Sequence, residues 1–239
     1  MYYPLFTLFA CIAGAIASFC TSKYTADRIQ LSRVDKTFIV LSGFCGAIIF
    51  AKLPFVLLTK DVLHNAGSIF LSGKTVLLGL VGGYLGVELG KWIRAVKTKT
   101  GDSFGVPVAV GIGVGRFGCF FGGCCYGVET RLPWGVVFPM IDQHPRHPNQ
   151  LYEATFHLAM ATVLFWMLKK GHLKGQLIKF YFLAYFVFRF LTEFLRPEIH
   201  WAGGLSAYQW AIVLLVPIFI GLWYLDVNRL QSRQTGNVG

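Results

Sequence analysis

The sequence has few charged residues, and this shortage excludes most soluble folds. Only 14% of its 239 residues are charged, 55% are hydrophobic, and the mean hydropathy is +0.57. A soluble domain carries about 25% charged residues, because its surface must face water. We therefore expect an integral membrane protein.

Acidic residues are especially scarce, with 11 Asp and Glu against 22 Lys and Arg. A net charge of +11 could indicate a nucleic-acid partner. The basic residues, however, cluster in short loops between apolar segments, where they orient a membrane protein. We expect no nucleic-acid partner. The six cysteines form no disulfide framework, and those in the apolar segments are expected to pack as small hydrophobic side chains, namely Cys11, Cys20 and Cys45.

Apolar segments of membrane-spanning length recur along the whole chain. We place them at 5–21, 37–58, 75–93, 104–121, 151–168, 177–195 and 207–225. The prediction is an all-α, polytopic membrane protein with about seven transmembrane helices in a single domain, 1–239. Thirteen lysines and arginines lie in one set of alternating loops and the tail, against six in the other set. This predicts the N-terminus outside, a cytoplasmic C-terminal tail (226–239) and a small outer-side cap at 119–149.

One segment, 111–127, combines seven glycines with a single arginine, Arg116. So many glycines make a poor helix interior but allow close backbone approach. A charged group at membrane depth is costly, and its presence indicates function by default. The sequence leaves two partners open for Arg116: a lipid phosphate, or a glutamate from another helix in a structural ion pair.

Two further polar clusters lie near the same side of the membrane. The first, 146–153, enters the fifth predicted span and supplies His147, Gln150, Tyr152 and Glu153. Helix capping and interfacial anchoring would also explain these residues. The second cluster places Arg189, Glu193 and Arg196 at spacings i, i+4 and i+7, which share one helix face.

The second cluster and Arg116 together supply more buried positive groups than Glu193 can neutralise. Arginine suits bidentate recognition of phosphate. The surplus therefore predicts an anionic ligand, and at this depth the ligand must be carried by a lipid.

These segments resemble the prolipoprotein diacylglyceryl transferases. The matching stretches are Gly-Arg-Phe-Gly at 115–118, the cluster at 146–153, the cluster at 189–196, and Gly-Gly-x-Leu-Gly at 82–86. The resemblance implies transfer of a diacylglyceryl group from phosphatidylglycerol to the thiol of a prolipoprotein or another acceptor, with release of glycerol phosphate. It also implies the bacterial inner membrane, an active site toward the outer side, and neither a metal nor an organic cofactor.

The residue patterns and the resemblance together give the candidate site residues. Candidate catalytic residues are Arg116, Arg189, His147 and Cys119, and candidate substrate-binding residues are Gly82, Gly83, Gln150, Tyr152, Glu153, Glu193 and Arg196. For Gly82 and Gly83, helix packing alone would also explain the small side chains.

The chain departs from the family pattern on the side of the general base. Val81 stands where the family carries a histidine, and Cys119 stands in place of an asparagine. His147 is the nearest candidate base, and His144 is the second.

Three cysteines follow Arg116, namely Cys119, Cys124 and Cys125. Simple packing, a disulfide from Cys119 to either neighbour, and a reactive thiol beside Arg116 are all open. A zinc site with a histidine ligand is the least favoured, because the cysteine spacing is not a standard zinc pattern.

Two other functions stay open at this point. A divergent relative could use the same lipid site with a different acceptor, which the missing histidine favours. A non-enzymatic phospholipid-binding or transport protein is the second, although the two halves of the chain show no inverted repeat.

Overall fold

A computed structural model describes residues 3–26, 31–58 and 75–235. Each predicted span is a helix: α1 (Tyr3–Thr25), α2 (Arg33–Leu58), α4 (Val76–Ile93), α5 (Gly101–Phe121), α6 (Asn149–Lys170), α7 (Leu177–Thr192) and α8 (Ala207–Thr235). Among the described residues, six helices are long and apolar enough to cross a membrane. The multi-span helical architecture is therefore confirmed. Helix α7 has only 16 residues, so the seventh span and the orientation stay predictions.

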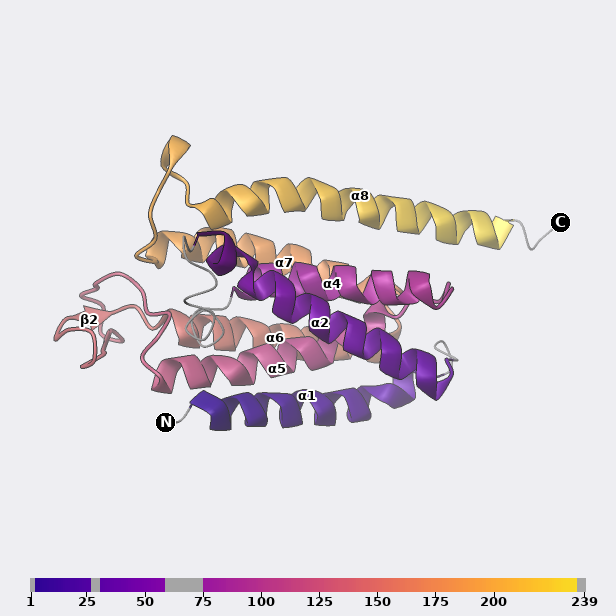
Figure 1. Ribbon diagram of the computed structural model, residues 1–239, viewed down its shortest axis with the longest axis horizontal. Coiled ribbons are helices and arrows are strands. Elements are labelled where there is room, and N and C mark those ends of the chain that lie inside the picture. The colour runs from indigo at the N-terminus through magenta and orange to yellow at the C-terminus, as the bar shows by residue number, and fades with distance from the viewer. Residues whose placement is uncertain (1–2, 27–30, 59–74, 236–239) are drawn as a thin grey trace. The chain divides into compact units, whose positions relative to one another are not determined.

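The chain divides into two compact units. One contains Met1–Asp27 and Thr100–Gly239, and the other contains Arg28–Lys99. In the first unit, α5 packs against α1 on one side and α6 on the other (Figure 1). Helix α8 continues as far as Thr235, so most of the predicted tail is helical.

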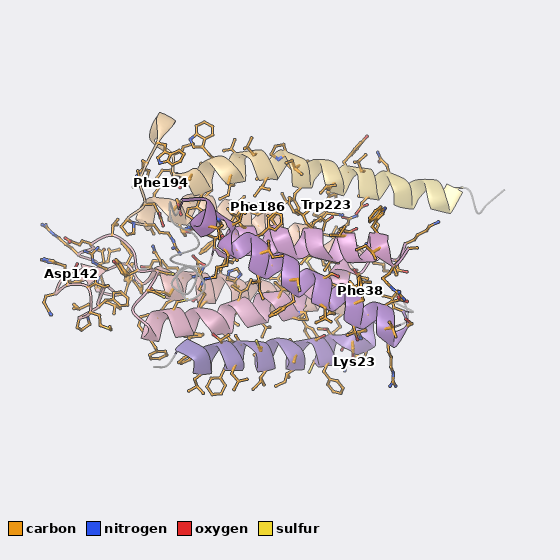
Figure 2. All side chains as sticks on the ribbon, in the orientation of Figure 1. Lys23, Phe38, Asp142, Phe186, Phe194 and Trp223 are labelled. Atoms are coloured by element: carbon orange, nitrogen blue, oxygen red, sulfur yellow. The ribbon has the colours of Figure 1, made fainter. Side chains whose placement is uncertain are left out.

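The core of the first unit is aromatic and lies along α7. Tyr181, Phe182, Tyr185 and Phe186 are all fully buried, and Phe219 of α8 packs edge-on against Phe186 with ring centroids 5.4 Å apart. The side chains of this layer are drawn in Figure 2, where Phe186 is labelled between the helices. These buried rings fix the packing of α7 against α8.

The glycine-rich segment does not interrupt its helix, because α5 runs unbroken from Gly101 to Phe121. Its small residues instead admit neighbouring helices. A Cβ atom on Gly118 would lie 2.6 Å from the Cβ of Phe6 in α1, and one on Gly113 would lie 2.9 Å from the side chain of Leu158 in α6. Tertiary packing therefore outweighs the low helix propensity of glycine here.

The second unit is the pair α2 and α4, which meet through glycines. A Cβ atom on Gly82 would lie 2.4 Å from the carbonyl oxygen of Gly46 and 2.3 Å from the Cβ of Phe50. Such contact between backbones needs residues without side chains. Helix packing accounts for Gly82, and lipid binding by Gly82 and Gly83 stays a prediction.

Beyond the end of α5, the cap is mostly irregular. Strands β1 (Val136–Val137) and β2 (Pro145–Arg146) pair antiparallel within it. The Arg146 guanidinium forms ion pairs with Asp142, in the loop between the two strands, and with Glu129, which precedes them. Asp142 lies in the cap, beyond the ends of α5 and α6 (Figure 2).

Candidate functional site

The polar residues of the first unit gather at one end of the helices, beside the cap. Arg116 lies near the end of α5, Glu153 in the second turn of α6, and Arg189 near the end of α7. Because α6 runs antiparallel to its neighbours α5 and α7, the end of α5, the start of α6 and the end of α7 meet there. The topology thus brings together residues up to 80 positions apart. We call Arg116, Glu153, Arg189, Glu193 and Arg196 the arginine site.

Glu153 is shared by two arginines. One carboxylate oxygen pairs with Arg116 of α5, and the other accepts a hydrogen bond from Arg196. All three side chains are buried, with Glu153 only 1% exposed. Burial alone would lower the pKa of Arg196, but the Glu153 carboxylate raises it above the usual value, so this guanidinium stays charged.

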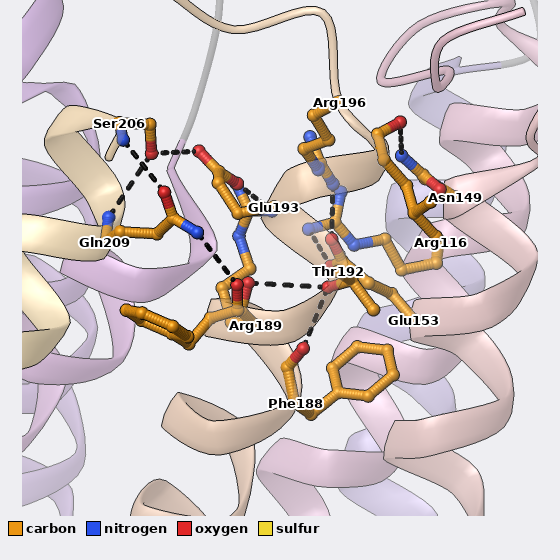
Figure 3. Close-up of polar contacts among 12 residues, drawn as sticks. Arg116, Asn149, Glu153, Phe188, Arg189, Thr192, Glu193, Arg196, Ser206 and Gln209 are labelled. Carbon is orange, nitrogen blue, oxygen red and sulfur yellow. Dashed lines mark hydrogen bonds and ion pairs between the residues drawn. The ribbon is translucent and has the colours of Figure 1, made fainter. Parts of the chain in front are cut away.

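The second carboxylate of the site, Glu193, pairs with Arg189 one helical turn before it. Its other oxygen accepts a hydrogen bond from the Ser206 hydroxyl at 2.7 Å. The guanidinium of Arg189 also lies over the ring of Tyr208, 5.1 Å from its centroid. Figure 3 shows the Glu153 and Glu193 groups on the facing helices. Both carboxylates are thereby held in place by partners from two elements.

The arginine site has three guanidinium groups and two carboxylates, which leaves one surplus positive charge. Two of its buried donors, Nε of Arg116 and Nε of Arg196, make no hydrogen bond within the described residues. Buried donors are almost always paired in folded proteins. The site therefore offers both charge and free N–H groups to an anion.

The sequence predicted two possible partners for Arg116, and the glutamate pairing is present. This pairing still leaves positive charge for an anion, because the single Glu153 carboxylate also pairs with Arg196. The prediction that Arg196 continues the helix face of Arg189 is wrong. Helix α7 ends at Thr192, and the 3-10 turn η1 (Glu193–Leu195) follows, so Arg196 turns toward α6 instead.

His147 of the cap and Tyr152 of α6 belong to one hydrogen-bonded group at the start of α6. Nδ1 of His147 lies 3.1 Å from the Tyr152 hydroxyl, which also accepts from Nε1 of Trp134 at 2.8 Å. In the described part of the chain, the His147 side chain makes no hydrogen bond to the arginine site. Side-chain capping of α6 does not explain this cluster, because no side chain caps its N-terminus.

Gln150 connects α6 to the turn that follows α5. It is fully buried, its amide donates to the carbonyl oxygen of Cys124, and its Oε1 has no hydrogen-bond donor among the described residues. Cys119, also buried, has its sulfur 4.0 Å from Nη1 of Arg116. Cys119 therefore lies beside Arg116, and Gln150 contacts the turn that follows α5.

Sequence reasoning missed several buried polar residues of this end. Ser206 and Gln209 bond each other reciprocally at the start of α8, Ser206 N–H to Oε1 at 2.9 Å and Gln209 N–H to Oγ at 3.3 Å. Ser-x-x-Gln before an apolar run is the signature of this capping box, so the signal was present. Asn149, which donates to the carbonyl oxygen of Leu195, follows from no local pattern.

His157, also unpredicted, lies one turn below Glu153. It is fully buried, and its Nδ1 is 2.7 Å from the Tyr181 hydroxyl. Its Nε2 has no hydrogen-bond partner in the described structure. A lone histidine in an apolar span gives no signal in the sequence, and only packing reveals its position near the arginine site.

Comparison with known proteins identifies the family. The family model for prolipoprotein diacylglyceryl transferase matches residues 2–225. The phosphatidylglycerol–prolipoprotein diacylglyceryl transferase of Bordetella avium is 34% identical over 207 residues, covering 82% of this chain and 75% of that protein. Enzymes of the same name from Clostridium tetani (29% over 203 residues, 80% of each chain) and Pseudoalteromonas atlantica (29% over 240 residues, 94% and 86%) are also similar. The chain belongs to the prolipoprotein diacylglyceryl transferase family.

Proposed function

We propose that this protein transfers the diacylglyceryl group of phosphatidylglycerol to the lipobox cysteine of a prolipoprotein. In this reaction the acceptor sulfur forms a bond to a glyceryl carbon, the bond from that carbon to the phosphate oxygen breaks, and glycerol phosphate leaves. The thiol proton must go to a base. The observation that carries the proposal is the surplus positive charge of the arginine site, together with membership of the family.

Arg116 and Arg189 are the proposed phosphate-binding and catalytic groups. As the carbon–oxygen bond breaks, negative charge builds up on the departing phosphate, and preorganised cations in a water-poor site stabilise it. Glu153 and Glu193 fix the directions of the guanidinium groups. Arg196, paired with Glu153, completes the proposed phosphate-binding group.

The acceptor side is proposed from position and chemistry. His147 is the proposed proton acceptor, because its Nδ1 is oriented by Tyr152 and its Nε2 makes no hydrogen bond in the described chain. Cys119 lies beside Arg116, where a guanidinium stabilises a thiolate, and we propose it as a proton relay. Gln150, bonded to the Cys124 carbonyl, and Tyr152, bonded to His147, are proposed to contact the substrate.

We further propose that the protein resides in the bacterial inner membrane with the cap on the outer side. The support is the excess of lysines and arginines in the loops on the opposite side. With this orientation a secreted prolipoprotein meets the arginine site after crossing the membrane.

The direct test incubates purified protein with phosphatidylglycerol and a lipobox peptide and follows the peptide mass. We expect the mass of one diacylglyceryl group to be added to the cysteine, and no addition to the matched peptide with serine in its place. An unmodified cysteine peptide, alongside an active relative as control, would refute the lipoprotein reaction.

A relative with another acceptor is a second candidate, favoured by Val81 and Cys119 at positions where the family carries histidine and asparagine. Complementation distinguishes the two, since growth of a strain depleted of its own transferase requires lipidation of prolipoproteins. Release of glycerol phosphate without complementation would favour the second candidate. No release at all would favour a lipid-binding or transport role.

A further inference from the structure

Three thiols converge beside the arginine site. The sulfur atoms of Cys119, Cys124 and Cys125 all lie within 4.8 Å of one another, and all three cysteines are free. Cys119 is buried and the other two are half-buried. We call these residues the thiol turn. Among the described residues, it is the one group of His, Cys, Asp and Glu with the geometry to hold a metal ion.

The turn that ends α5 brings these thiols close together. After α5 ends, the Cys124 N–H donates to the carbonyl oxygen of Cys119 at 3.1 Å, which reverses the chain. The reversal is a common C-terminal helix motif with positive φ at Gly123 (+63°), and Cys125, just beyond it, also has positive φ (+61°). Positive φ is costly for a residue with a side chain, so a cysteine held there indicates a constraint by its surroundings. The amide of Gln150, bonded to the Cys124 carbonyl, supplies part of it.

The thiol trio suits a soft cation better than a disulfide. A Zn–S length of about 2.3 Å places three sulfurs about 4 Å apart around one ion, which the observed spacing permits. A disulfide between the adjacent Cys124 and Cys125 would be strained, and any single disulfide would leave the third thiol unpaired. Three thiolates and a divalent ion carry a net charge of −1, and the Arg116 guanidinium beside Cys119 offsets it.

We propose that the thiol turn binds a thiophilic d¹⁰ cation, such as Zn²⁺ or Cd²⁺, through three sulfur ligands. The cysteine spacing in the sequence predicted no metal site, and the proposal rests on the fold instead. A water molecule or a substrate group would fill the fourth position of the ion.

The effect of a bound ion on activity rests on the proposed function. A bound ion engages Cys119 and draws the Arg116 guanidinium toward the anionic metal–thiolate group. Both are then withdrawn from phosphatidylglycerol and from proton transfer. The ion is therefore a reversible inhibitor of the transferase.

Cadmium binding tests the site without any need for activity. The reduced protein in detergent is titrated with Cd²⁺ under nitrogen, and the thiolate-to-cadmium absorption in the ultraviolet is recorded. We expect one ion per chain and no signal in the Cys119→Ser/Cys124→Ser/Cys125→Ser variant. Single substitutions should weaken binding by about 100-fold or more, because loss of even an outer-shell partner costs about 10- to 100-fold.

The matched control is Cys20→Ser, which removes a thiol from α1 and should bind Cd²⁺ like the wild type. Absence of the absorption in reduced wild-type protein would overturn the proposal. So would the same absorption in the triple variant, or an intramolecular disulfide that forms in place of the cadmium complex.

Inhibition is measured separately on the transfer reaction. We expect Cd²⁺ to inhibit the wild type and to leave Cys124→Ser/Cys125→Ser unaffected, with basal transfer retained in that variant. Equal inhibition of both proteins would overturn the inhibitory role. If the wild type shows no transfer at all, the proposed function fails, while the cadmium titration still decides whether the thiol turn is a metal site.

Discussion

The arginine site and the cap both contain arginine–carboxylate ion pairs, but those of the arginine site are buried and those of the cap face water. In the cap, Arg146 pairs with Asp142 and with Glu129, whose side chain is 60% exposed. In the arginine site, the Glu153 side chain is 2% exposed and serves two guanidinium groups. Ion pairs in water contribute little, because solvent screens them and already solvates each partner. The arginine site is buried and cannot be solvated, so its surplus positive charge is available to a ligand. Changes in the arginine site should therefore have larger effects than changes in the cap.

The largest effect is expected from Arg116→Ala and Arg189→Ala. Each should lower the rate of transfer by about 100- to 1,000-fold, because a preorganised charge partner of the leaving group is lost. The rate of lipidation of a lipobox peptide measures this effect. Arg146→Ala is the matched control, since it removes the same side chain from the cap. Equal losses in all three variants would mean that the contrast between the two regions is wrong.

Glu153→Gln should act on stability. The substitution leaves two buried guanidinium groups without their carboxylate, and breaking a buried pair in this way costs about 3–5 kcal/mol. Thermal unfolding in detergent measures the change. Adding Arg196→Gln should recover part of the loss, because one fewer buried charge is then unpaired. Strictly additive losses in the double variant would show that the two residues do not form one group.

Cys119→Ser should be the most damaging change in the thiol turn. We expect transfer to fall by about tenfold or more, because a positioned proton-transfer group contributes about 10²–10⁴. Cys124→Ser and Cys125→Ser should retain transfer, since Cys119 is the thiol beside the Arg116 guanidinium. Turnover of the three variants with and without reductant decides this. Three fully active, reductant-insensitive variants would leave only a packing role.

The smallest effect is expected in the cap, and it depends on pH. The hydrogen bond from Arg146 holds the pKa of Asp142 below its usual value. A carboxyl whose folded pKa lies below its unfolded pKa, about 3.9, adds stability above that pH and loses it as the pH falls through the folded value. Acid should therefore loosen the wild-type cap below about pH 4.

The Asp142→Asn variant should lack this acid transition. Trp134 fluorescence measures the loosening of the cap, because Trp134 lies in the cap and its indole donates a hydrogen bond to Tyr152 of α6. Transfer at neutral pH should be unchanged in this variant. A strong loss of transfer would show that the cap pairs contribute to the chemistry.

Apolar runs in the sequence predicted each of the seven α-helices in the described part of the chain, because length and hydropathy decide which segments can cross a bilayer. The glutamate partner that the sequence left open for Arg116 is present in Glu153. The contact between Arg196 and Glu153, 43 residues apart, was not predicted. It forms because η1 redirects Arg196 toward α6. That contact depends on how the ends of α6 and α7 meet, and no local pattern encodes it.

The thiol turn also could not be predicted from the sequence, although its three cysteines lie close together in the chain. The spacing of its cysteines disfavoured a metal site, yet the left-handed backbone at Cys125 brings the sulfurs together. Backbone dihedrals of this kind are predictable at glycine, as at Gly123, but not at a cysteine. Conversely, the capping box of Ser206 and Gln209 was readable from the sequence alone.

Lipid binding by native mass spectrometry tests most directly whether the buried surplus charge recognises a lipid phosphate. Wild type, Arg116→Ala and Arg146→Ala are compared for retention of phosphatidylglycerol and of diacylglycerol, which has the same chains and no phosphate. We expect Arg116→Ala to retain more than about tenfold less phosphatidylglycerol than the wild type, and to retain diacylglycerol as the wild type does. Arg146→Ala should retain both lipids like the wild type. Parallel loss of both lipids in Arg116→Ala, or undiminished binding of phosphatidylglycerol, would contradict the account.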